Sequence, residues 1–147
     1  MTGGGSVFFV FEGHDIRVTH GFQLRVPPTG QPESLEVNWK DPNIPGPAEQ
    51  QFHLDLLTSA VCAGNPLDTL VVTGIGLLND VPGATIEAVF VDAGEPGKDS
   101  DTATFVIRGS NGVVVLVSSG TLERGNHQRT APRPSRTAGQ SGASPPS

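Results

Sequence analysis

The sequence predicts an all-β domain: an antiparallel β-sandwich of the jelly-roll or immunoglobulin-like type, with about eight strands. Glycine and proline contribute 19 and 13 of the 147 residues. Together they make up about a fifth of the chain, where average usage gives nearer an eighth. Both residues interrupt helices. Short apolar runs rich in β-branched side chains recur roughly every 10 to 15 residues, which is typical of sandwiches and small barrels. No apolar run approaches the ~20 residues of a membrane-spanning helix.

The first half of the chain contains four predicted strands, at residues 7–11, 15–26, 35–39 and 52–62. Their apolar residues alternate with polar ones, which is the pattern of a half-buried strand. In the second strand the alternation slips at His20-Gly21, which suggests a bulge or bend. Three prolines between Asp41 and Glu49 predict a loop before the fourth strand.

The second half contains four more predicted strands, at residues 68–78, 84–91, 102–108 and 113–122. Gly74 and Gly76 in the first of these indicate crowding by a neighbour or a bend. Turn residues at 79–83 and the pair Asn111-Gly112 predict tight connections. The expected core is aromatic, with these anchors: Phe9, Phe22, Trp39, Phe52, Phe90 and Phe105.

Charge and composition divide the chain into a β-domain at residues 1–123 and a disordered tail at 124–147. All 15 acidic residues lie at or before Glu123, and four of the nine basic residues follow it, so the two parts carry −10 and +4. The tail has no large apolar side chain and cannot offset its ordering entropy. The acidic body argues against nonspecific nucleic-acid binding, which needs Lys and Arg opposite phosphates.

The N-terminus lacks the basic region and apolar core of a signal peptide. The chain is therefore expected to be either cytoplasmic or a piece of a longer exported polypeptide. Cys62 is the single cysteine, so an internal disulfide is excluded. It is interpreted as a small buried hydrophobe, with a free thiol available for intermolecular pairing as the alternative.

The densest polar cluster is a candidate calcium loop formed by Asp92, Glu95, Asp99 and Asp101. Calcium takes six to eight oxygen ligands and tolerates irregular loops. The spacing does not match an EF-hand, and the alternative is a solvated acidic turn with Lys98 as a partial counter-charge. The cofactor prediction is accordingly none, or Ca²⁺.

Trp39 and Lys40, at the end of a strand, are the candidate ligand-binding residues and would line a glycan groove. The favoured interpretation of Trp39 is core packing. The four histidines have no close ligand spacing, so surface or hydrogen-bonding roles are preferred to zinc binding: His14, His20, His53 and His127.

Catalysis is not expected. The Gly-x-Ser-x-Gly elbow of serine hydrolases is absent. The carboxylates available for a glycosidase pair alternate with apolar residues and are assigned to the wet faces of strands: Glu36, Asp55 and Glu87. The serines considered as nucleophiles lie in predicted strands: Ser59, Ser118 and Ser119.

Several segments carry a resemblance to a known domain type: Thr2–Ser6, Arg17–Phe22, Leu35–Trp39, Asp92–Gly97 and Gly125–Gln128. Over roughly residues 2–128 the chain resembles an uncharacterised all-β domain of bacterial secreted and cell-surface proteins, of the post-choice-of-anchor type. The resemblance implies an extracellular, noncatalytic accessory module, structural or adhesive, within a longer exported protein. Neighbouring copies, neighbouring domains or cell-surface glycan are its expected partners. A carbohydrate-binding module, with or without calcium, is the alternative, and a small hydrolase a distant one.

Overall fold

The computed structural model of the chain describes all residues except 12, 26–32, 41–48, 65–67, 95–96 and 129–147. The described residues form nine strands and no helix. Among them there is consequently no helix with the length and apolarity to cross a membrane. The predicted all-β, antiparallel class is confirmed, with nine strands rather than about eight.

Eight of the strands correspond to the predicted ones, and a ninth follows them. They are β1 (Thr2–Phe11), β2 (His14–Gln23), β3 (Ser34–Trp39), β4 (Gln50–Ala63), β5 (Thr69–Leu78), β6 (Val81–Val91), β7 (Thr102–Arg108), β8 (Val114–Thr121) and β9 (Arg124–Gln128).

The strands belong to one antiparallel sheet in the order β8-β7-β6-β5-β4-β3-β2-β1-β9. Each strand from β1 to β8 pairs with its neighbours in the sequence, and β9 returns to pair with β1. This meander differs from the Greek-key connections expected of an immunoglobulin-like or jelly-roll sandwich. Strand spacing alone does not distinguish the two, because it fixes the length of each strand but not its partner.

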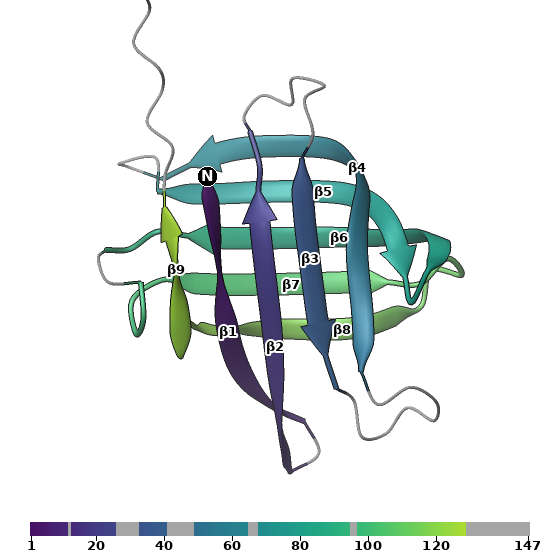
Figure 1. Cartoon of the computed structure of the whole chain (residues 1–147), viewed down its shortest axis with the longest axis horizontal. Coiled ribbons are helices and arrows are strands. Elements are labelled where there is room, and N and C mark those ends of the chain that lie inside the picture. The colour runs from purple at the N-terminus through teal and green to yellow at the C-terminus, as the bar shows by residue number, and fades with distance from the viewer. Residues whose placement is uncertain (12, 26–32, 41–48, 65–67, 95–96, 129–147) are drawn as a thin grey trace, which may run out of the picture.

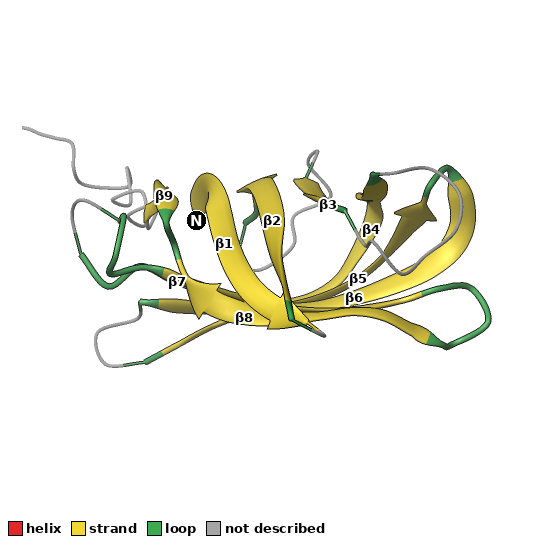
Figure 2. Cartoon of the chain, turned by 90° about the horizontal axis from the view of Figure 1, so that it is seen from below, coloured by secondary structure: helices red, strands yellow, loops and turns green. Residues whose placement is uncertain are grey.

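The sheet curls over on itself. Strands β1, β2, β3 and β9 cross steeply over β5 to β8 (Figure 1), and the side view shows the two parts as facing layers (Figure 2). Strand β4 passes from one layer to the other. It pairs with β3 only through Gln50–His53, whereas it pairs with β5 along nearly its whole length.

Two irregularities in β4 make this change of layer possible. The register with β5 shifts between Leu54 and Leu56 and again between Leu57 and Ser59. On the facing strand, a Cβ at Gly74 would lie 3.0 Å from the Leu56 carbonyl oxygen, and one at Gly76 would lie 2.8 Å from Phe52 Cζ. The crowding predicted for these two glycines is therefore confirmed.

The core lies between the two layers. Five of the six predicted aromatic anchors are buried there: Phe22, Trp39, Phe52, Phe90 and Phe105. The side chain of the sixth, Phe9, lies outside the described part of the structure. Leucine, valine, isoleucine and alanine side chains from β1 to β8 fill the remaining space.

The bulge expected at His20-Gly21 is wrong. The pairing of β2 with both β1 and β3 continues through these residues without a shift in register. The inward positions of β2 are Ile16, Val18, His20 and Phe22, so the alternation is unbroken and His20 occupies a core position. The slip is only apparent, because histidine is a polar residue type but its side chain here points into the core.

The domain boundary expected after residue 123 is also wrong. Arg124–Gln128 form β9, which pairs with β1 through residues 2–6. Low apolar content suggested disorder, but this strand is held by backbone pairing and by one buried side chain, His127. The remainder of the predicted tail, 129–147, lies outside the described residues.

Candidate functional site

A buried pair of histidines is the most unusual polar feature of the described structure. His20 projects from β2 and His127 from β9, and their Nε2 atoms lie 2.7 Å apart. The two residues are 6% and 0% exposed, respectively. Strand β1 lies between their two strands, so the rings meet across it.

Glycine in β1 allows this contact. Gly3 pairs with His127, and Gly5 pairs with His20. Gly3 and Gly5 therefore share the face of β1 over which the two rings come together. A Cβ at Gly3 would lie 2.9 Å from His127 Cδ2 and 2.6 Å from the Asn126 carbonyl oxygen. The glycine-rich start of the chain thus makes room for the second histidine and its strand.

Three phenylalanines enclose the pair. The His20 ring stacks on Phe22 and Phe90 at centroid distances of 6.1 and 5.6 Å, and is tilted against Phe105 at 5.3 Å. The His127 ring meets Phe22 and Phe90 edge-on at 5.3 and 5.5 Å. Edge-to-face and offset contacts of this kind are favourable for aromatic rings. The surroundings are apolar, which disfavours a charged imidazolium.

The hydrogen bonds assign the protons of the pair. His127 Nδ1 lies 3.1 Å from the Val91 carbonyl oxygen, which can only accept, so Nδ1–H donates. His127 Nε2 is then an acceptor, and His20 Nε2–H donates to it. His20 Nδ1 is left without a hydrogen-bond partner in the part of the chain that the structure describes. A chain of two neutral imidazoles therefore ends on a backbone carbonyl.

Burial keeps both rings neutral. It lowers the pKa of His20 to about 3, with a further contribution from the neighbouring His127. Burial also lowers the pKa of His127, partly offset by the Val91 carbonyl and by the negative charges of Asp101 and Asp92. The pair is therefore uncharged at neutral pH and holds its strands together by hydrogen bonding and packing.

Asp101 connects this pair to the loop that was predicted to bind calcium. Its carboxylate is fully buried and accepts hydrogen bonds from the backbone N–H of Ala93 at 2.8 Å and of His127 at 2.7 Å. Two backbone donors on one carboxylate fix both the start of the loop and the position of β9. Asp101 thus helps to position the histidine pair by bonding to the backbone of His127.

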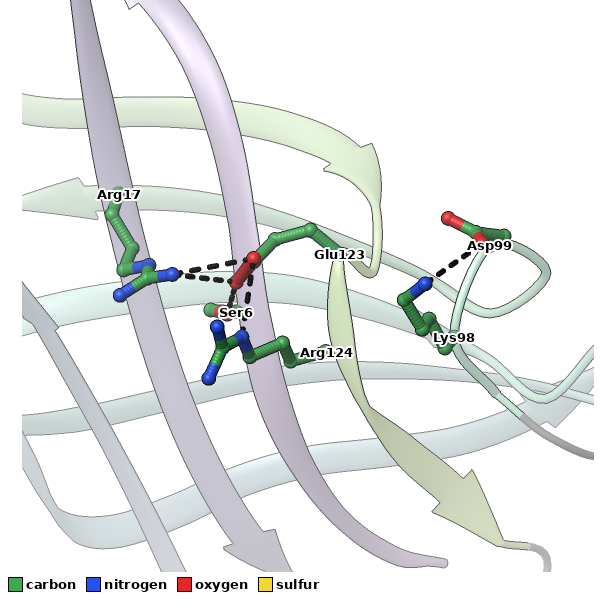
Figure 3. Close-up of polar contacts among 6 residues, drawn as sticks. All are labelled: Ser6, Arg17, Lys98, Asp99, Glu123 and Arg124. Atoms are coloured by element: carbon green, nitrogen blue, oxygen red, sulfur yellow. Dashed lines mark hydrogen bonds and ion pairs between the residues drawn. The ribbon is translucent and has the colours of Figure 1, made fainter.

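The other described carboxylates of the predicted calcium loop are less buried than Asp101. Asp99 is exposed and forms an ion pair with its neighbour Lys98 at 3.4 Å (Figure 3). Asp92 is partly buried, and Glu95 lies outside the described residues. Across the described ranges, no three His, Cys, Asp or Glu side chains are grouped so as to hold a metal ion.

The two candidate glycan-binding residues, Trp39 and Lys40, differ in exposure. Trp39 is 2% exposed and belongs to the core, whereas Lys40 is exposed. The indole Nε1–H has no hydrogen-bond partner among the described residues. Trp39 therefore supplies core volume, in line with the favoured interpretation, and presents no platform to solvent.

A polar cluster centred on Glu123, which directly precedes β9, joins residues of β1, β2 and β9 and is absent from the sequence predictions. Glu123 accepts a hydrogen bond from Ser6 Oγ, pairs with Arg17 at 3.2 Å and contacts Arg124 at 3.6 Å (Figure 3). The Ser6 hydroxyl, and after it Arg17, lowers the pKa of Glu123. The Arg17 guanidinium also lies 5.0 Å from the centre of the Phe8 ring, which is 47% exposed.

Residues considered for other chemistry lie apart. Glu36 pairs with His53 at 3.3 Å, and this exposed partner lowers the pKa of Glu36. Glu87 pairs with Arg108, and Asp55 and Ser59 are exposed on β4. Ser118 is buried, whereas Ser119 is exposed and shares a hydrogen bond with Thr104.

Cys62 is exposed, so its expected burial is wrong. Cys62 lies at the end of β4, next to the last strand residue Ala63, and is exposed although its partner Leu70 is buried. The thiol remains free, as the single-cysteine count requires.

Comparisons with models of known protein families, with curated proteins and with solved structures found no match to this chain.

Proposed function

We propose that this domain is a noncatalytic structural or adhesive accessory module of an exported bacterial protein, in which the curled sheet acts as a two-layered sandwich. The observation that carries the proposal is the use made of the histidine pair. His20 and His127 are buried, neutral and bonded to each other, so they serve to join β2, β1 and β9. A catalytic histidine must instead reach its substrate and exchange protons near the working pH.

The position of the first and last described strands supports a modular role. Thr2 pairs with Gln128, so a polypeptide continuing past both would enter and leave the domain at one corner (Figure 1). Such a module projects sideways from the chain that carries it. This placement suits presentation of a surface to a partner better than it suits spacing domains along a line.

A screen of the full chain with generic ester and glycoside substrates tests the noncatalytic part of this proposal. No turnover above a buffer blank is expected. Ser119 and Glu87 are exposed and contact Thr104 and Arg108 on β7. Turnover that disappears in Ser119→Ala or in Glu87→Gln would overturn the proposal. Thr104→Ala is the matched control for Ser119→Ala, because it removes the other hydroxyl of the same hydrogen bond.

Carbohydrate binding is the second candidate function, and Phe8 favours it. Its half-exposed ring lies against Arg17, which in turn pairs with Glu123, so an apolar face adjoins charged hydrogen-bonding groups, as in sugar sites. A glycan array would detect binding that is lost in Phe8→Ala and kept in Val10→Ala, since Val10 lies two residues along the same strand and is also exposed. An array without a signal, or equal signals from both variants, would reject this function.

Calcium binding also remains a proposal, because one of its four predicted ligands, Glu95, lies outside the described residues. Millimolar Ca²⁺ should raise the melting temperature and chelator should lower it if the loop binds the ion. Asp99→Asn tests the exposed carboxylate without disturbing the buried Asp101. Equal melting temperatures in calcium and in chelator would exclude the site.

A further inference from the structure

The hydrogen bonds of the histidine pair leave no favourable position for a further proton. Two neutral imidazoles carry two N–H groups, one on His127 Nδ1 facing the Val91 carbonyl and one between the two Nε2 atoms. A third proton would stand on His20 Nδ1, which has no acceptor among the described residues, or would place two N–H donors face to face. A charged pair is therefore unfavourable as long as β9 holds His127 against His20.

The surroundings of His20 give a charged ring no compensation. Among the described residues, His127 is the one titratable group that contacts the His20 ring, and it is neutral itself. The carboxylates of Asp101 and Asp92 act on His127 instead. The other neighbours of His20, on its own strand and on the strands around it, carry no charge: Phe22 of β2, Gly5 of β1, Val37 of β3, Phe90 of β6 and Phe105 of β7.

Strand β9 is short and is held from one side. Its five residues pair with Thr2–Ser6 of β1, and it stands last in the sheet order. His127 is the one buried residue of β9, and the strand contributes no apolar side chain to the core. Strands β1 to β8 pair in an unbroken series without it. Because β9 adds so little to the core, it can open while the rest of the sheet stays folded.

Opening β9 changes the environment of His20. It withdraws His127, which is the bonding partner of His20 Nε2 and forms one side of the enclosure around the ring. Gly3 and Gly5 of β1 have no side chains that could cover the space left behind. In the closed form burial lowers the pKa of His20 to about 3. In the open form the ring meets water and its pKa returns towards the ordinary value of about 6.5.

We propose that β9 is an acid-sensitive latch, which opens from β1 with increasing frequency below about pH 6.5 while β1 to β8 stay folded. Protonation of His20 stabilises the open form and not the closed one, so acid shifts the equilibrium towards opening. Each pH unit below about 6.5 raises the open fraction about tenfold through His20 alone.

The latch acts where the polypeptide leaves the domain. Thr2 pairs with Gln128, so both ends of the described sheet meet at one corner. Releasing the five residues of β9 at about 3.4 Å each frees roughly 17 Å of polypeptide there. The proposal does not rest on the accessory-module function, because it depends only on the contacts of β9.

Amide hydrogen exchange of the full chain at pH 7.5, 6.5 and 5.5, corrected for the intrinsic exchange rates, tests the proposal. The N–H groups of β9 should be at least about tenfold less protected than those of β6 at every pH, since β9 opens on its own. Their protection should fall at least about tenfold between pH 7.5 and 5.5. Protection of β9 equal to that of β6 would overturn the proposal, because β9 would then open only with the whole domain. Protection of β9 that is constant over these pH values would overturn it as well.

Two variants assign the pH dependence to its histidine. His20→Gln removes the titrating group and keeps an N–H donor for His127 Nε2, so the fall in β9 protection should be about tenfold smaller than in the native chain. His53→Gln is the matched control, because it removes an exposed histidine that pairs with Glu36, and the full fall should remain. An equal fall in His20→Gln and the native chain would refute the role of His20. The two outcomes measured on the native chain decide the proposal even if His20→Gln folds poorly.

Discussion

Mild acid is expected to destabilise the domain through its buried histidine pair. The pKa of His20 is about 3 in the folded chain, and an imidazole in an unfolded chain has a pKa near 6.5. Below about pH 6.5 the His20 imidazole therefore binds a proton in the unfolded chain but stays neutral in the folded chain. The stabilisation is fully present above pH 6.5 and falls as the pH decreases towards about 3.

The size of the effect follows from these two values. Within that window each pH unit removes about 1.4 kcal/mol of the free energy of unfolding for one such group. Lowering the pH from 7.5 to 5.5 should therefore cost about 1.4 kcal/mol for His20 alone, and lowering it to 4.5 about 2.7 kcal/mol. His127, whose pKa is also lowered, adds to the loss in the same direction. Total stabilities of roughly 5–15 kcal/mol make this loss measurable.

Urea titrations followed by circular dichroism at pH 7.5, 6.5 and 5.5 measure the slope. These values stay above the range in which Glu36 and Glu123 contribute, since their lowered pKa values give a stabilisation that is lost only below about 4.5. In His20→Phe the decrease between pH 7.5 and 5.5 should shrink by about 1.4 kcal/mol. His53→Gln is the matched control, because it removes an exposed histidine from the same domain.

The slope is decisive, and the stability at pH 7.5 is not. His20→Phe also removes the hydrogen bond to His127, which lowers stability at every pH. A native chain with equal stability at pH 7.5 and 5.5 would refute the reasoning. So would a His20→Phe variant that loses as much stability on acidification as the native chain.

Three further outcomes follow from the structure. Gly3→Ala should lower the free energy of unfolding by at least about 2 kcal/mol, because its Cβ would press on β9. Gly21→Ala is the control and should change it by less than about 1 kcal/mol, because the space around Gly21 is open. Equal losses in urea titrations would contradict this prediction. Asp101→Asn should cost about 1–3 kcal/mol, because Ala93 and His127 donate to different carboxylate oxygens and the amide replaces one of these acceptors with an NH2 donor. An unchanged melting temperature would argue against the assigned bonds. In the native state Cys62 should react with a thiol reagent at the rate of a free thiol, and Trp39 emission should be blue-shifted and poorly quenched by iodide. A thiol that reacts only in denaturant would contradict the exposure of Cys62. A readily quenched indole would contradict the burial of Trp39.

Periodicity predicted most of the sheet because each hairpin is local. The burial of Thr102–Arg108 alternates strictly along the strand, and its predicted bounds and its inward Phe105 are both confirmed. The same rule applied to β2 placed Ile16, Val18 and Phe22 correctly. It missed His20 only because a polar residue type was weighted above its position in the alternation.

The histidine pair depends on information that is not local. His20 and His127 are 107 positions apart, and β9 has no apolar alternation to announce it. The available signal was the glycine run at Gly3 to Gly5, which indicates close approach of another backbone. It gave no indication of which segment approaches. The sequence also gave no sign that Asp101 is buried and accepts hydrogen bonds from two backbone N–H groups.

The pairing of β1 with β9 also constrains the order in which the strands can pair during synthesis. Strands β1 to β8 can pair in the sequence in which they leave the ribosome, because neighbours in the chain are neighbours in the sheet. The outer edge of β1 and the Nε2–H of His20 can bond to their partners in β9 only after His127 has emerged. Until then the nascent domain exposes an open strand and an unbonded imidazole, the kind of surface that aggregates or engages chaperones. The described sheet is therefore complete only once the five residues of β9 have been made and paired with β1.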